Sequence, residues 1–194
     1  MLPRIAPLLA VAAALAPSAR LAVPAVAGVP PPTLTPLDER RLSRNGRVES
    51  VQRTGRKGDA WVVLDTAMEP EEAYAAVADV ASYATRMRGV RSAKTKTTES
   101  LTRAAFKVTK FRLPANLVFA PDPARLRVAF ALDAERTNVA VERLAGCWHV
   151  SPRPGGGSRV SLRASVEACK IVPAAAVAYV AEKALARATA LLDP

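Results

Sequence analysis

Residues that could perform acid–base or nucleophilic chemistry are few in this sequence. His149 is the only histidine, so a histidine-rich metal site is excluded, and a Ser-His-Asp array would have to use this one ring. Trp148 and Val150 flank it on the apolar side of an alternating segment, which places His149 on the opposite, polar face. We therefore expect a solvated or structurally hydrogen-bonded imidazole, no metal site and no catalytic residue.

Four carboxylates are candidate proton donors for a cyclisation or hydration: Asp65, Asp79, Asp133 and Glu142. Asp79 is more simply explained as a cap or turn residue where a helix breaks. Asp133 and Glu142 have the polar parity of their segments, and no two acids form a convincing pair. The run 155–157 is three glycines between two predicted strands, with no helix after it, so it indicates a hairpin turn and not a phosphate-binding loop.

The two cysteines are predicted to be free thiols. A hairpin centred on Gly155 and Gly156 pairs Cys147 with a residue near Arg163. Cys169 then lies roughly 20 Å farther along the strand. A disulfide needs Cα atoms within about 7 Å, so this register keeps the thiols apart, although cysteines as such would suit an oxidising compartment.

The elements that would position these residues are strands followed by one terminal helix. From 159 to 168, apolar and polar residues alternate, which predicts a half-buried strand over 158–169. After Val172 and Pro173 the apolar period changes to about 3.6, and 174–192 is predicted to be a long amphipathic helix. If the helix lies across the sheet, its apolar stripe and the apolar face of the sheet bury each other.

Earlier segments predict the remainder of that sheet. A hairpin is expected over 48–53 and 60–68, and a helix begins at Glu69 and Pro70, where proline and acids suit a first turn. A change of parity predicts a β-bulge near 143–146. Further strands are expected over 90–98, 102–111, 117–119, 125–133 and 139–150, with turns at 114–116, 121–123, 137–138 and 152–157.

Composition and the N-terminal segment indicate the partners, the location and the domain organisation to expect. The chain has 194 residues, 50% of them hydrophobic, and 28 Lys and Arg against 17 Asp and Glu give a net charge of +11, which favours anionic partners. Arg4, the apolar run 5–16 and Ala25-Val26-Ala27 predict a signal peptide over 1–27, hence export to the periplasm or outside the cell. An organelle transit peptide and an uncleaved membrane anchor are the alternatives. A Pro-rich linker follows over 28–46, with a short helical turn at 37–44, and one ligand-binding domain over 47–194.

This order of elements resembles the START-like (SRPBCC) superfamily of helix-grip proteins, specifically its polyketide cyclase/dehydrase and coenzyme Q-binding branch. The resemblance implies an α+β fold in which a curved antiparallel sheet of about six or seven strands wraps around a long C-terminal α-helix, with a short helical segment after the first strands. It also implies a cavity for a lipid, quinone, sterol or polyketide-like molecule, in a superfamily that mostly binds and does not react. The segments that carry the resemblance are 69–74 (EPEEAY), 79–83 (DVASY) with Gly89-Val90, 146–148 (GCW) and Val172-Pro173.

The predicted function is non-enzymatic binding or transfer of a hydrophobic small molecule. We expect no cofactor, and we expect the protein to be a monomer. A polyketide cyclase/aromatase-type enzyme and an interaction module with a filled core are the alternatives. Basic residues suit an anionic membrane surface, and the absence of interleaved aromatic residues argues against nucleic acid. Arg86 and Arg88 stand where relatives often have an aromatic residue and a proline, and with Arg91 they are predicted to face a membrane. The predicted ligand-binding residues are Tyr83, Met87, Phe106, Val108, Phe119, Val128, Phe130, Leu132, Trp148, Val160, Leu162, Val177, Val180, Ala181 and Leu185.

Overall fold

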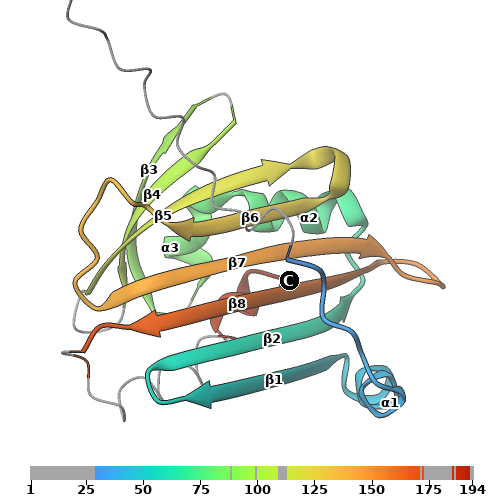
Figure 1. Ribbon diagram of the computed structural model, residues 1–194. Coiled ribbons are helices and arrows are strands. Elements are labelled where there is room, and N and C mark those ends of the chain that lie inside the picture. The colour runs from blue at the N-terminus through green and yellow to red at the C-terminus, as the bar shows by residue number, and fades with distance from the viewer. Residues whose placement is uncertain are drawn as a thin grey trace, which may run out of the picture.

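The protein is built on one curved antiparallel sheet (Figure 1). The computed structural model describes residues 29–87, 89–98, 100–108, 113–170, 172, 185 and 187–192. Within them the sheet has eight strands in the order β1-β2-β8-β7-β6-β5-β4-β3. The strands are β1 (Arg47–Thr54), β2 (Lys57–Thr66), β3 (Val90–Thr97), β4 (Thr102–Val108), β5 (Leu113–Asp122), β6 (Arg127–Leu132), β7 (Val141–Pro152) and β8 (Ser158–Ala168).

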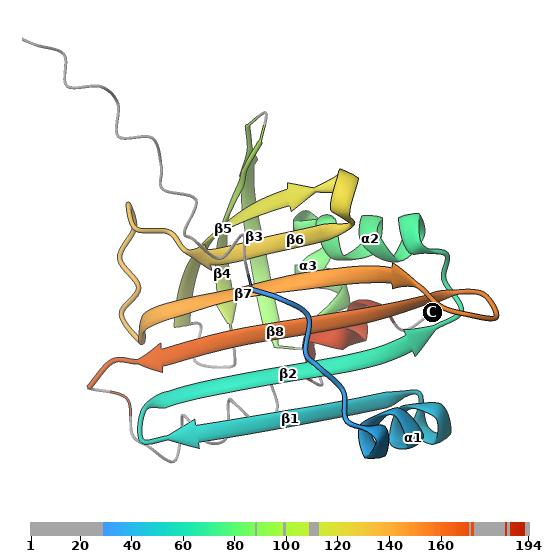
Figure 2. The ribbon, with the colours of Figure 1, turned by 45° about the vertical axis from the view of Figure 1, so that its right-hand side comes forward.

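Short helices occupy the connection between β2 and β3 and lie on the concave side of the sheet (Figure 2). They are α2 (Pro70–Ala78), the 3-10 turn η2 (Val80–Ser82) and α3 (Tyr83–Arg86). The predicted start of α2 is confirmed, with Pro70 in its first turn. Asp79 caps the start of η2, as predicted, because its side chain accepts a hydrogen bond from the Ser82 amide.

The eight strands exceed the six or seven that the resemblance implies, although eight strand segments were expected along the sequence. The strand β5 is longer than expected. Residues 117–119 were expected to be a short strand between turns at 114–116 and 121–123. In the structure Pro114 pairs with Lys107 and Pro121 pairs with Val128, both inside the ladder. The φ angle of proline is compatible with an extended strand, and proline lacks only the amide donor. Near the end of a strand it therefore destabilises the sheet little.

The predicted C-terminal helix falls largely on residues outside the described part of the chain. Val177, Val180 and Ala181 are among these, and the described end of the segment is the 3-10 turn η4 (Thr189–Leu192). Leu191 and Leu192 are buried against the core. The α+β class with one curved antiparallel sheet is confirmed, whereas the long helix stays a prediction.

The β7–β8 hairpin has the register that the glycines predict. Cys147 pairs with Arg163, and both cysteines are free, as expected. Burial raises the pKa of the Cys147 thiol to about 11, so it stays protonated. The register irregularity in β7 lies between Val141 and Arg143, slightly before the bulge expected at 143–146.

The helix α1 (Pro36–Asn45) is longer than the turn expected at 37–44. A reciprocal capping box between Thr35 and Asp38 starts it, and Gly46, at a φ of +66°, ends it. Leu42 is buried against Val48 and Val63, on the convex face of the sheet. Residues 29–35 reach α1 by crossing this face in Figures 1 and 2. Within the described residues, no helix is long and apolar enough to cross a bilayer.

Candidate functional site

The concave face of the sheet is one continuous apolar surface. In the ladder, Leu162 lies between Val62 and Trp148, and Trp148 in turn pairs with Val128. All four are buried, with Val62 and Val128 fully inaccessible. Because side chains directly opposite in an antiparallel pair point to the same face, alternation in each strand builds a single surface across β2, β8, β7 and β6.

Aromatic rings from four elements meet at one end of this surface, although only 5% of the residues are aromatic. Tyr83 of α3 stacks on Phe106 of β4 with ring centroids 6.0 Å apart, and it meets Phe119 of β5 edge-on at 5.9 Å. Phe119 continues the row to Phe130 of β6 at 5.7 Å. Such pairs contribute roughly 0.5–1.5 kcal/mol each beyond area burial, so the row fixes α3 against the sheet.

Tyr83 is the ionisable side chain within this aromatic row. The residue is only 4% exposed, and its hydroxyl donates a hydrogen bond of 2.6 Å to the Val77 carbonyl. Burial raises the pKa of the phenol far above its usual value, helped by the charge of Asp79. The hydroxyl therefore stays neutral, and its proton is used to hold α3 against the end of α2.

Gly146 lets one of these rings lie flat on β7. A Cβ at this position would stand 2.5 Å from Cζ of Phe130 and 2.5 Å from the Arg163 carbonyl oxygen. Phe130 is the direct ladder partner of Gly146. The missing side chain thus makes room for the ring, which gives a physical reason for the glycine in the 146–148 segment.

The structure brings the described members of the predicted ligand-binding set together. Val177, Val180 and Ala181 lie outside the described residues. Tyr83, Phe106, Phe119, Val128, Trp148, Val160, Leu162 and Leu185 are buried in one cluster, and Met87, Val108, Phe130 and Leu132 are partly buried against it.

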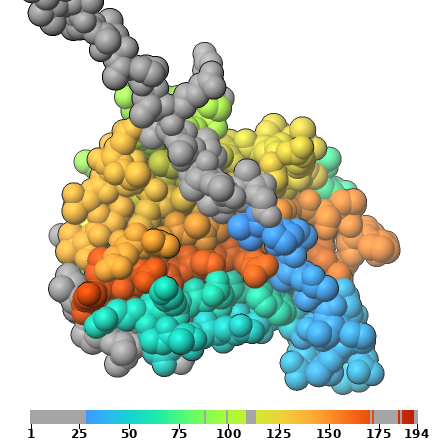
Figure 3. Space-filling model, viewed as in Figure 1, coloured from blue at the N-terminus to red at the C-terminus, as the bar shows by residue number. Residues whose placement is uncertain are grey.

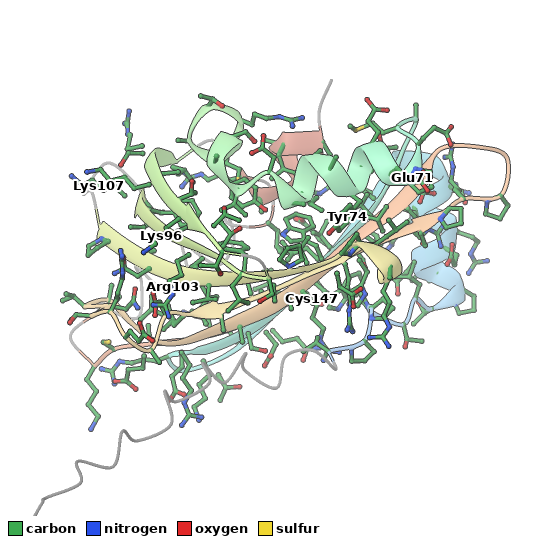
Figure 4. All side chains as sticks on the ribbon, turned by 90° about the horizontal axis from the view of Figure 1, so that it is seen from above. Glu71, Tyr74, Lys96, Arg103, Lys107 and Cys147 are labelled. Carbon is green, nitrogen blue, oxygen red and sulfur yellow. The ribbon has the colours of Figure 1, made fainter. Side chains whose placement is uncertain are left out.

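Sequence reasoning missed the cover that α2 and η2 provide. Ala73, Ala76, Val77 and Val80 are buried in the same cluster as the sheet residues. Figure 4 shows side chains filling the space between α2 and the sheet. Ala73, Ala76, Val77 and Val80 are spaced by three, one and three residues, which is the spacing of one helix face, so this signal was present in the sequence.

The arginines predicted to face a membrane have varied surroundings. Arg86 donates a hydrogen bond to the Leu191 carbonyl, so it ties α3 to the C-terminal segment. Gly89, shortly after α3, also lies against the C-terminal segment. A Cβ at this position would be 3.3 Å from Nη1 of Arg187. Arg91 is exposed on the edge strand β3, and Arg88 lies outside the described residues.

The candidate acids do not reach the apolar face. Asp65 forms an ion pair with Arg159, with Oδ1 and Nε 2.9 Å apart. Asp133 is 2% exposed and lies 3.3 Å from Nη1 of Arg103. Glu142 is exposed. In the described part of the chain, no three His, Cys, Asp or Glu residues are grouped so that they could hold a metal ion.

His149 is hydrogen-bonded as the sequence predicts. Its Nε2 lies 2.9 Å from the Val29 carbonyl oxygen and therefore donates the proton. Burial lowers the pKa of the imidazole, and the charge of Arg127 lowers it further, against the opposing effect of the Val29 hydrogen bond. The ring is a clip between β7 and the segment that leads to α1, away from the aromatic row.

Comparison with known proteins agrees with this architecture. The solved aromatase/cyclase Zhui from Streptomyces sp. R1128 has a TM-score of 0.62 at 16% identity, covering 70% of this chain and 92% of that one. A STAR-related lipid transfer protein from Xanthomonas axonopodis has a TM-score of 0.60 at 12% identity, covering 76% and 92%. A START superfamily protein from Mycobacterium smegmatis has a TM-score of 0.55 at 14% identity, covering 76% and 94%.

Sequence comparison gives the family. A search of curated proteins found no significant match. The family model described as polyketide cyclase / dehydrase and lipid transport matches residues 66–191, well over half of the chain. The predicted resemblance to START-like proteins is confirmed, and the chain belongs to the polyketide cyclase/dehydrase and lipid transport family.

Proposed function

We propose that this protein binds and transfers a hydrophobic small molecule, such as a lipid, a quinone or a polyketide-like compound, on the concave face of its sheet. The observation that carries the proposal is the continuous apolar surface from β2 to β6, joined to the aromatic row of Tyr83, Phe106, Phe119 and Phe130. Ligand sites are mostly apolar with few polar groups. Met87, Val108, Phe130 and Leu132 are only partly buried, so among the predicted ligand-binding residues they are the ones best placed to touch a ligand.

Binding without chemistry suits the distribution of ionisable groups. Asp65 and Asp133 are held in ion pairs, and Asp79 caps η2. Tyr83 stays neutral, with its proton donated to the Val77 carbonyl. A general acid must reach the reacting atom within hydrogen-bond distance, and none of these four side chains is free to do so.

A cyclase or aromatase activity is the second candidate. Its support is the similarity in fold to the Zhui aromatase/cyclase and the membership of a family that includes both polyketide cyclases and lipid transport proteins. Such an enzyme needs a proton donor facing the apolar surface. Tyr83 is the described ionisable side chain in that row, so a Tyr83→Phe variant tests this candidate directly.

The primary test is native mass spectrometry of the full chain, followed by solvent extraction of whatever travels with it. A co-purifying lipid, quinone or polyketide supports the proposal and identifies the ligand class. The absence of both a bound molecule and a change in melting temperature on adding phospholipids and quinones would overturn it in favour of a filled core. Product formation from a poly-β-ketone substrate that is lost in Tyr83→Phe would favour the enzyme.

A matched pair of variants on β4 sharpens this test. Val108 packs on the apolar cluster, whereas its neighbour Lys107 is exposed. Val108→Gln should weaken ligand retention because it places a polar amide on the apolar surface, and Lys107→Gln should retain the ligand. Equal losses of ligand in the two variants would mean that the ligand does not contact this face.

Export through residues 1–27 and a monomeric state remain parts of the proposal.

A further inference from the structure

The outer face of α1 carries positive charge in an ordered pattern. Leu37, Arg40, Arg41 and Arg44 are spaced by three, one and three residues, so they form one stripe along the helix. All four are exposed. Leu37 is 48% exposed, an unusual position for a large apolar side chain in the described part of this protein. We call these four residues the basic face of α1.

The acidic side chains of α1 lie on its other sides, where they bind partners within the protein. Asp38 accepts hydrogen bonds from the backbone and hydroxyl of Thr35. These bonds, and to a smaller extent the charge of Arg41, hold the pKa of Asp38 below its usual value. Glu39 lies 2.9 Å from Nη1 of Arg159 on β8. The charges are thus separated: the carboxylates are engaged within the protein, and the guanidinium groups are presented outward.

The helix is held firmly in this orientation. Leu42 is 1% exposed and packs on Val48 and Val63 of the sheet. Arg159 joins Glu39 of α1 to Asp65 of β2, which adds a polar tie. Figure 3 shows α1 as a projecting corner of the molecule. A convex, projecting, fixed surface can meet an extended flat partner without rearrangement of the fold.

We propose that the basic face of α1 docks on an anionic lipid bilayer. Charge complementarity supplies the attraction, since each basic residue near an anionic leaflet adds to binding. Leu37 beside the arginines fits the interfacial mode, in which an apolar side chain enters the headgroup region. Single-stranded nucleic acid is a poorer fit, because α1 carries no aromatic side chain on which a base could stack.

The test compares two charge-matched triple variants of the full chain. R40Q/R41Q/R44Q removes the charge of the basic face, and R91Q/K94Q/K96Q removes the same charge from exposed positions of the edge strand β3. Sedimentation is measured with phosphatidylcholine vesicles that contain phosphatidylserine. Vesicles of phosphatidylcholine alone report any insertion of the apolar N-terminus. The α1 variant should lose on the order of 100-fold in affinity for the anionic vesicles, and the β3 variant severalfold at most.

Two further variants separate docking from damage to the fold. R40K/R41K/R44K keeps the charge and should bind the anionic vesicles as the unmodified protein does. Leu37→Ala should reduce affinity by a few fold, with unchanged circular dichroism. Equal losses in the α1 and β3 triple variants would overturn the proposal in favour of a general charge effect. Wild-type affinity in the α1 variant, or binding of the unmodified protein to single-stranded RNA and not to anionic vesicles, would also overturn it.

Discussion

The two faces of the sheet are stabilised by different interactions, although the same strands supply both. On the concave face of β8 and β7, Leu162 and Trp148 are buried in a cluster that continues into α2. On the convex face of the same strands, Arg159 forms an ion pair with Asp65, and His149 binds the Val29 carbonyl. The concave face is held by one large apolar cluster, whereas the convex face combines a small apolar cluster of Leu42, Val48 and Val63 with individual polar contacts.

This difference has an energetic consequence. Removing a large buried apolar side chain costs both the transfer free energy and the free energy of the cavity left behind. A partly exposed hydrogen bond contributes only about 0.5–1.5 kcal/mol. Global stability should therefore depend mainly on the concave face, while changes on the convex face should mainly loosen the segment 29–45.

The largest expected effect compares two neighbouring residues of β7. Trp148→Ala should lower the free energy of unfolding by about 3–5 kcal/mol, because it removes a buried indole from the cluster. His149→Ala should cost about 1 kcal/mol, the contribution of one hydrogen bond. Urea denaturation followed by circular dichroism measures both. Equal costs would show that the two faces contribute alike.

A smaller effect is expected where β6 and β7 meet on the concave face. Gly146→Ala should destabilise the protein by about 1–3 kcal/mol, since the new Cβ overlaps the Phe130 ring and the Arg163 carbonyl. In a Phe130→Leu background the cost should be lower, because only the contact with the carbonyl remains. A double-mutant cycle of unfolding free energies measures this coupling. Strict additivity would mean that Phe130 does not need the glycine.

The smallest effect is a pH dependence from the convex face. Burial lowers the pKa of His149 in the folded state, so the unfolded chain binds the proton first as the pH falls. Stability is then full above the unfolded pKa of about 6.5 and decreases below it, by less than about 1 kcal/mol for this partly exposed group.

The variant His149→Gln is the control, because its amide can still donate to the Val29 carbonyl but does not titrate. It should lack the part of the stability loss that appears between about pH 7 and about pH 5.5. Unfolding free energies of the two proteins at several pH values give the difference directly. An unchanged profile in the variant would assign the loss to the carboxylates.

Much of the site could be predicted because parity is a local property of the sequence. Alternation assigned Phe106, Val128, Trp148 and Leu162 to one face before any neighbour was known, and the structure places them in one cluster. The glycines at 155–157 gave the register that opposes Cys147 and Arg163. By contrast, Pro114 and Pro121 are typical of turns in a local pattern, and that pattern does not reveal that a neighbouring strand continues past them.

The sequence by itself determined the face of each strand, the start of α2, the free thiols and the family. Only the tertiary structure decided that β8 lies between β2 and β7, that α2 packs on β6, β7 and β8 and that Arg86 binds the Leu191 carbonyl. It also decided which side of α1 points outward, because Leu42 and Glu39 find their partners on β1, β2 and β8. Periodicity comes from the backbone geometry of a few consecutive residues, whereas these arrangements depend on contacts between residues far apart in the chain.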